Sequence, residues 1–136
     1  GYNMGDYMNH WLEMGDKLGD KAPKIFYVNW FRKDADGKWL WPGFGDNSRV
    51  LKWMCERVEG KIEAKDTPIG RMPKEGDLDL TGLKIDEADF KELMRVDIEA
   101  WKNQANEIEN HYSKFGDRLP QRLKKQLEEL RARLNK

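Results

Sequence analysis

Apolar residues recur near the start of the chain at spacings of four, three and four. They are Tyr7, Trp11, Met14 and Leu18. This spacing places the four side chains on one face of an α-helix, so it predicts a helix with a single buried stripe. Gly19 follows where the helix should end, because glycine readily adopts the conformation that closes many helices.

Aromatic and β-branched residues then crowd the run 24–31, a composition typical of a strand. The sequence Asp-Ala-Asp-Gly at 34–37 favours a tight turn, and residues 38–41 are again short and strand-like. We therefore expect a β-hairpin formed by residues 24–31 and 38–41, which Pro42 ends.

A second helical face follows the glycine-rich loop 43–46. Its apolar residues are Val50, Leu51, Met54, Cys55 and Val58. Asp46 or Asn47 can cap the start of this helix and Gly60 can close its end. Residues 67–73 are extended, but their two prolines confine them to a sheet edge or a covering loop.

Helical spacing dominates the last third of the chain. Apolar residues alternate spacings of four and three at Met94, Ile98, Trp101, Ala105, Ile108, Tyr112 and Phe115. After a break at Gly116 and Pro120, the rhythm returns at Leu123, Leu127, Leu130 and Leu134. Two such faces joined by a short connection predict an antiparallel helical hairpin. Together the patterns predict an α+β fold with a small β-hairpin or mixed strands and several helices.

Composition fits one small domain with a thin core. Of the 136 residues, 38% are hydrophobic and 37% charged, although six Trp, five Phe and four Tyr supply large side chains to bury. Lys plus Arg and Asp plus Glu both total 25, so the formal net charge is zero. A neutral chain without a basic stripe argues against binding to nucleic acid or to a membrane surface.

The single cysteine, Cys55, cannot form an intramolecular disulfide, so we expect a reducing, cytoplasmic location. No apolar run approaches the ~20 residues of a membrane helix, and the first residues do not resemble a signal peptide. The chain opens directly onto a predicted helix without an initiating methionine. We therefore expect a fragment of a longer protein.

The sequence is poor in the combinations that catalysis requires. Its two histidines, His10 and His111, lie in predicted helices far apart, where surface or packing roles are more common. Acidic residues mostly share helix faces with lysine and arginine, where they pair or meet water. No segment matches a P-loop, and residues 43–45 begin like a dinucleotide fingerprint but lack its third glycine. We assign no catalytic residue and no metal ligand.

Aromatic residues gather at the predicted hairpin and the glycine loop, namely Trp30, Phe31, Trp39, Trp41 and Phe44. A planar base binds well between two aromatic faces, and the glycines beside Phe44 let backbone approach a ligand. Asn47 carries both donors and an acceptor, so it can recognise a purine edge. These parts suit a nucleobase site. The alternative is ordinary cross-strand packing of the aromatics, with Asn47 as a helix cap.

Two segments around these aromatics carry a more specific likeness. They are Pro-Lys-Ile-Phe-Tyr-Val-Asn-Trp-Phe-Arg-Lys at 23–33 and Leu-Trp-Pro-Gly-Phe-Gly-Asp-Asn-Ser-Arg-Val-Leu at 40–51. Both resemble the guanine-binding stretch of GTP-dependent phosphoenolpyruvate carboxykinases. Further agreement comes from residues 1–3, 10–12, 67–70 and 73–78. Residues 84–136 match less tightly, although 114–120 are similar to bacterial members.

The resemblance implies roles for five residues. In that family two phenylalanines sandwich the guanine, and their positions fall on Phe31 and Phe44. A third aromatic lines the pocket and falls on Trp39, where phenylalanine is usual. The asparagine that recognises the guanine edge falls on Asn47, and Trp30 borders the pocket.

The resemblance also implies that the chain is a single C-terminal fragment of the nucleotide-binding domain. Residues 1–83 would carry the guanine slot and residues 84–136 the helical end. The parent enzyme would convert oxaloacetate and GTP into phosphoenolpyruvate, carbon dioxide and GDP, using Mn²⁺ or Mg²⁺. The family's phosphate loop, metal ligands and reactive cysteine all precede the matched region, so Cys55 does not correspond to that cysteine.

The expected partners are therefore a guanine nucleotide, GTP or GDP, and the remainder of the parent enzyme. Neither nucleic acid nor a membrane is expected. A non-catalytic interaction or scaffold module is the alternative class. In that case the aromatics would form the core and the helical faces would bind a partner.

Overall fold

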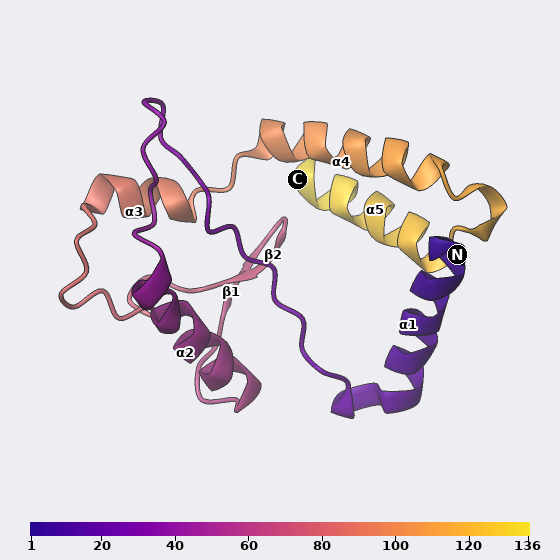
Figure 1. Ribbon diagram of the computed structural model, residues 1–136, viewed down its shortest axis with the longest axis horizontal. Helices are drawn as coiled ribbons and strands as arrows, with labels where there is room; N and C mark the ends of the chain where they lie inside the picture. Colours follow the sequence, from indigo (N-terminus) through magenta and orange to yellow (C-terminus); the bar gives the residue numbers. More distant parts are fainter. The chain divides into compact units, whose positions relative to one another are not determined.

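The computed structural model describes all residues, 1–136, and they form two compact units. One unit is continuous and contains residues 24–96, whereas the other combines residues 1–23 with residues 97–136. Figure 1 shows the helices and the short two-stranded sheet that make up these units. This mixture confirms the expected α+β fold. None of the helices combines the length and the apolar character needed to cross a lipid bilayer.

Helix α1 (Met4–Leu18) begins the discontinuous unit. Asn3 caps it by accepting a hydrogen bond from the Gly5 amide at 2.8 Å, and Gly19 ends it with φ of 51°. The predicted buried stripe is wrong, because Tyr7, Trp11 and Leu18 are exposed. The buried residue of the helix is instead Gly5.

Gly5 sets which face of α1 packs inward. A Cβ at this position would collide with the carbonyl group of Arg118, so only glycine permits the approach. Ion pairs reinforce the contact, since Arg118 lies 2.8 Å from Asp6 and Arg122 lies 2.7 Å from Asp16. The contact of Gly5 with the Arg118 backbone therefore decides which face of α1 packs inward. The spacing of apolar residues does not reveal this contact.

Helices α4 (Ile98–Ser113) and α5 (Gln121–Leu134) run antiparallel beside each other, which confirms the predicted helical hairpin (Figure 1). The buried side chains of this unit are Ala105, Leu119, Leu127 and Leu134. At the edge of the pair, Arg131 donates hydrogen bonds to Glu109 at 2.9 Å and to Asn106 at 3.0 Å.

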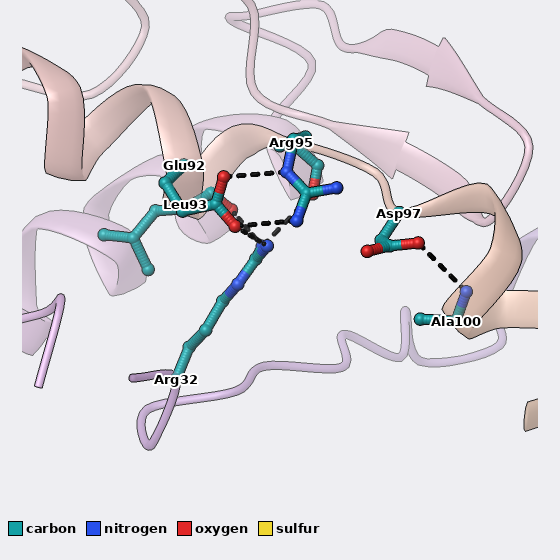
Figure 2. A network of polar contacts seen from close by, with 6 residues as sticks. All are labelled: Arg32, Glu92, Leu93, Arg95, Asp97 and Ala100. Atoms are coloured by element: carbon teal, nitrogen blue, oxygen red, sulfur yellow. Dashed lines mark hydrogen bonds and ion pairs between the residues drawn. The ribbon is translucent and has the colours of Figure 1, made fainter. Parts of the chain in front are cut away.

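The helical repeat of the last third spans two helices, where the spacing predicted one. Met94 ends α3 (Glu87–Met94), and Arg95 then adopts an extended conformation. Asp97 begins α4 by accepting a hydrogen bond from the Ala100 amide at 2.9 Å, as Figure 2 shows. A capping side chain therefore starts a new helix although the apolar spacing continues without interruption.

The continuous unit has a small core made of Leu40, Trp41, Trp53 and Leu78. Trp53 belongs to α2 (Asn47–Val58), and its ring meets that of Phe26 edge-on at 6.1 Å. Strands β1 (Lys65–Thr67) and β2 (Gly70–Met72) form the antiparallel sheet, with Lys65 opposite Met72. The segment expected to be extended therefore supplies most of this sheet.

The hairpin predicted for residues 24–31 and 38–41 is reduced to a single bridge between Lys33 and Trp39. Its turn is present, because the Asp34 carboxylate accepts hydrogen bonds from the amides of Asp36 and Lys38, both at 2.9 Å. The pairing of the two strands does not extend further, since the Phe31 amide donates its hydrogen bond to the Asn29 side chain. Local side-chain bonds here replace the strand pairing.

The close approach at Gly5 makes a direct prediction. Gly5→Ala should lower the free energy of unfolding, because the new methyl group would force α1 away from the Arg118 carbonyl. Gly15→Ala is the matched control in the same helix, where an added Cβ meets nothing within 4 Å. It should raise stability by about 0.5–1 kcal/mol. Urea unfolding measures both, and a stabilising Gly5→Ala would contradict the packing described.

Candidate functional site

Two of the five expected site residues lie together on an exposed turn. The rings of Phe31 and Trp39 meet edge-on, with centroids 5.7 Å apart and planes inclined by 67°. The ammonium group of Lys33 lies 4.2 Å from the centroid of the Trp39 ring, a cation–π contact that holds one face of the indole. Phe31 is 72% exposed, so a large part of its ring remains open to a ligand.

Phe44 is displayed by a strained backbone. Its φ is 42°, a value that non-glycine residues seldom adopt, and Gly43 before it has φ of 81°. The Phe44 side chain is 98% exposed and makes no ring contact with another aromatic residue. Strain of this kind costs about 1–3 kcal/mol and gathers at functional sites, so an unburied ring held this way points to a ligand.

Asn47 is the first residue of α2, but its side chain does not act as a helix cap. Its Oδ1 atom accepts a hydrogen bond from the indole nitrogen of Trp41 at 2.8 Å. Trp41 is 5% exposed, so this bond satisfies a buried donor. The fifth expected residue, Trp30, is half-buried next to Phe31 in the sequence.

Arg49 fastens the start of α2 to a neighbouring loop. Its guanidinium donates to the Asp46 carboxylate at 3.0 Å and to the backbone carbonyls of Asp79 at 2.5 Å and Thr81 at 2.9 Å. These bonds hold the segment that carries Phe44 and Asn47.

A second arginine anchors the aromatic turn, as Figure 2 shows. Arg32 donates to the Glu92 carboxylate at 2.7 Å and to the carbonyls of Leu93 and Arg95 at 3.2 and 3.1 Å. The carbonyls at the end of a helix carry partial negative charge, so a guanidinium is favourable there. Arg95 bonds the other oxygen of the same carboxylate at 2.7 Å. The turn beside Phe31 is thereby tied to the end of α3.

Charge pairing perturbs two groups in this anchor. The hydrogen bond from Arg95 holds the pKa of Glu92 below its ordinary value of 4.5, assisted by the positive charges of Arg95 and Arg32. Lys38 lies 3.1 Å from Asp89 on α3, and the hydrogen bond to that carboxylate raises the pKa of the lysine. The Lys38–Asp89 contact, like the bond from Arg32 to Glu92, links the turn to α3.

A hollow of about 940 Å³ lies elsewhere in this unit, between the β1–β2 hairpin and α3. None of the five expected site residues lines it. Its charged side chains are of both signs and comprise Lys65, Lys74, Lys91, Arg95, Asp66, Glu75, Glu87 and Glu92. A balanced lining of this kind selects no particular ligand charge.

Groups able to perform catalysis or bind metal are dispersed. Cys55 is exposed and unpaired with another cysteine, and His111 packs edge-on against Phe115 at 5.2 Å. No group of three His, Cys, Asp or Glu side chains is placed to hold a metal ion together. The residues of this chain do not fit a metal site, so no metal role is assigned to any of them.

The chain matches, over residues 1–133, the family described as phosphoenolpyruvate carboxykinase C-terminal P-loop domain. It belongs to that family, which confirms the resemblance seen in the sequence. A relative named phosphoenolpyruvate carboxykinase [GTP] from Treponema pallidum (strain Nichols) is 54% identical over 137 residues. Relatives of the same name from Neocallimastix frontalis and Arthrobacter sp. (strain FB24) are 54% and 50% identical. These alignments cover 98–99% of this chain and 22% of each relative. The chain therefore spans about a fifth of their length.

Sequence reasoning missed the two side chains that position the candidate site, Arg32 and Trp41. For Trp41 a signal was present, because a buried tryptophan needs an acceptor for its N–H and Asn47 lies nearby in the sequence. No comparable signal existed for Arg32, because its partners are about 60 residues away in the sequence and two of them are backbone carbonyls.

The lowered pKa of Glu92 predicts a specific pH dependence. A carboxylate with a depressed folded-state pKa stabilises the fold above its unfolded-state pKa, and this contribution is lost as the pH falls through the folded-state value. Glu92→Gln should therefore lower the urea unfolding midpoint at pH 7, and its difference from the unsubstituted chain should shrink below pH 4.5. Glu99→Gln, on the other unit, is the control and should change little. A difference that persists unchanged at low pH would contradict the ionic origin.

Proposed function

We propose that this chain supplies the guanine-binding part of a GTP-dependent phosphoenolpyruvate carboxykinase. The observation that carries the proposal is the exposed ring of Phe44 on a strained backbone, three residues before the fixed carboxamide of Asn47. In the proposed site Phe31 and Phe44 stack on the faces of the base and Asn47 bonds its edge. Trp39 and Trp30 complete the lining.

The exposure of the rings supports this proposal over an aromatic core. Phe31, Trp39 and Phe44 all lie at the surface of the chain, whereas Leu40 and Trp41 fill the core between them in sequence. Stacking of an exposed phenyl ring on a planar base is favourable, because the contacting face of the ring and that of the base both leave water. A ring already buried in a core would offer no such surface.

The family membership of the chain also supports a proposal for the reaction of the whole protein. Relatives that carry the name phosphoenolpyruvate carboxykinase [GTP] are matched along one fifth of their length. We assign to the whole protein the conversion of oxaloacetate and GTP into phosphoenolpyruvate, carbon dioxide and GDP, in the cytoplasm and with Mn²⁺ or Mg²⁺. This chain would orient the nucleotide through its base while residues outside it bind phosphates and metal. Residues 1–83 as the slot region and 84–136 as the helical end remain part of the proposal.

Phe44→Ala tests the stacking role without disturbing the core, because the side chain is 98% exposed. Loss of one stacked face should weaken GDP binding by about 1–3 kcal/mol, roughly a 5- to 150-fold rise in Kd. Tryptophan fluorescence titration of the complete polypeptide that carries this sequence measures it. The KM for GTP should rise more than the KM for oxaloacetate.

Tyr27→Ala is the matched control, since Tyr27 is an aromatic residue of the same unit that is 87% exposed and assigned no role. It should leave the Kd for GDP unchanged. Equal effects of Phe44→Ala and Tyr27→Ala on that Kd would overturn the assignment of Phe44 to a base site.

The 136-residue chain alone should not form phosphoenolpyruvate from oxaloacetate and GTP. The family resemblance places the phosphate loop and the metal ligands before this region, and no cluster of metal-binding side chains exists within it. A coupled assay of phosphoenolpyruvate formation with added Mn²⁺ measures this. A rate of phosphoenolpyruvate formation that rises in proportion to the concentration of the chain and disappears with a chelator would contradict this prediction. It would show that the chain itself carries catalytic groups.

A further inference from the structure

The hydrogen bond between Trp41 and Asn47 has a direction set by chemistry. The indole nitrogen of Trp41 lies 2.8 Å from Oδ1 of Asn47. An indole N–H only donates, whereas a carboxamide has an accepting oxygen at one end and a donating NH₂ group at the other. The amide oxygen must therefore face the indole, and this contact determines the orientation of the Asn47 side chain.

Reversal of that orientation would leave a buried group unsatisfied. Trp41 is 5% exposed, so water does not readily replace the amide oxygen as its acceptor. A flipped amide would point its NH₂ group at the indole N–H, and two donors do not bond to each other. Loss of the acceptor of a buried donor is costly. Asn47 is therefore held in one of its two amide orientations.

The NH₂ group of Asn47 is the part that remains for a ligand. It makes no hydrogen bond with any other group of the chain, and the residue is only half-buried at the first position of α2. Asn47 thus offers a hydrogen-bond donor, and not an acceptor, to a base bound at the turn that displays Phe44.

A fixed donor distinguishes the two purines at one position. Guanine carries an accepting oxygen at position 6, whereas adenine carries a donating amino group there. We infer that Trp41 is a positioning residue for guanine specificity, because it holds the NH₂ group of Asn47 toward the 6-oxygen of a guanine nucleotide and against the 6-amino group of an adenine nucleotide. This inference rests on the proposed function.

Trp41→Phe removes the N–H and keeps a ring to fill the core. The substitution frees the Asn47 amide to rotate and present its oxygen to adenine. The ratio of the Kd for ADP to the Kd for GDP should fall by about tenfold or more, as expected when one polar contact to a base edge loses its direction. Isothermal titration calorimetry on the complete polypeptide measures both constants. Inosine diphosphate has the 6-oxygen without the 2-amino group of guanine, so its Kd should rise with that of GDP.

Two further variants separate positioning from a general loss of structure. Asn47→Asp keeps an oxygen for Trp41 but replaces the donor toward the base with an acceptor, so it should also lower the ADP-to-GDP ratio. Repulsion between its added charge and the diphosphate is common to GDP and ADP and cancels from the ratio, whereas its effect on the base edge does not. Trp41→Phe combined with Asn47→Asp should lower the ratio no further than Asn47→Asp alone, because both changes act on one contact.

Phe44→Ala separates this inference from the proposed function. Stacking tolerates any base, so that variant should weaken GDP and ADP alike and leave their ratio unchanged. Absence of an effect on GDP binding would refute the proposed site itself. An unchanged ratio in Asn47→Asp, in a folded protein whose GDP binding still depends on Phe44, would refute the role of Trp41. If Trp41→Phe does not fold, an unchanged ratio in Asn47→Asp still refutes the inference, because the donor that Trp41 is said to position would then play no part in specificity.

Discussion

Burial of Trp41 is the constraint on which the candidate site depends. Its indole N–H needs an acceptor inside the protein, and that acceptor lies only six residues further on, at the start of α2. The chain between them must turn back on itself, which it does through Gly43 and the left-handed conformation of Phe44. A requirement of the core thus fixes the carboxamide of Asn47, three residues after the exposed ring of Phe44.

The two sides of the proposed slot are anchored independently. Arg32 ties the turn with Phe31 to the end of α3, and Arg49 ties the start of α2 to the loop 79–81. Both arginines use backbone carbonyls, which cannot be lost through changes of side chain at those positions. No contact links the rings of Phe31 and Phe44 directly. The separation of the two rings therefore depends on these two anchors.

Sequence reasoning succeeded where a residue's role is local. Helix spacing identified α2, α4 and α5, and the turn chemistry at Asp34 was correct even though the flanking strands were not. It failed where distant parts of the chain decide the outcome. The packed face of α1 depends on Gly5 meeting Arg118, far away in the sequence. The boundary between α3 and α4 has a local cause, the cap at Asp97, but a capping side chain leaves the apolar spacing unchanged. Apolar periodicity carries neither signal.

The same limit applies to the candidate site. A likeness to known sequences singled out Phe31, Phe44 and Asn47, yet it did not identify the groups that orient them. Those groups act through a buried donor and through carbonyls far away in the sequence, which composition and spacing do not encode. A sequence therefore indicates which side chains can contact a ligand more readily than it indicates what fixes their geometry.

The close approach of Gly5 to Arg118 also has a consequence for how the chain acquires its structure. The two parties are separated by the whole continuous unit, residues 24–96. A ribosome delivers α1 long before Arg118 and Arg122, so α1 lacks these partners while the intervening unit can already fold. Contacts between such remote segments also close slowly, because a large loop must be restricted to form them. The discontinuous unit should therefore be the last to assemble, because its two segments lie on either side of residues 24–96.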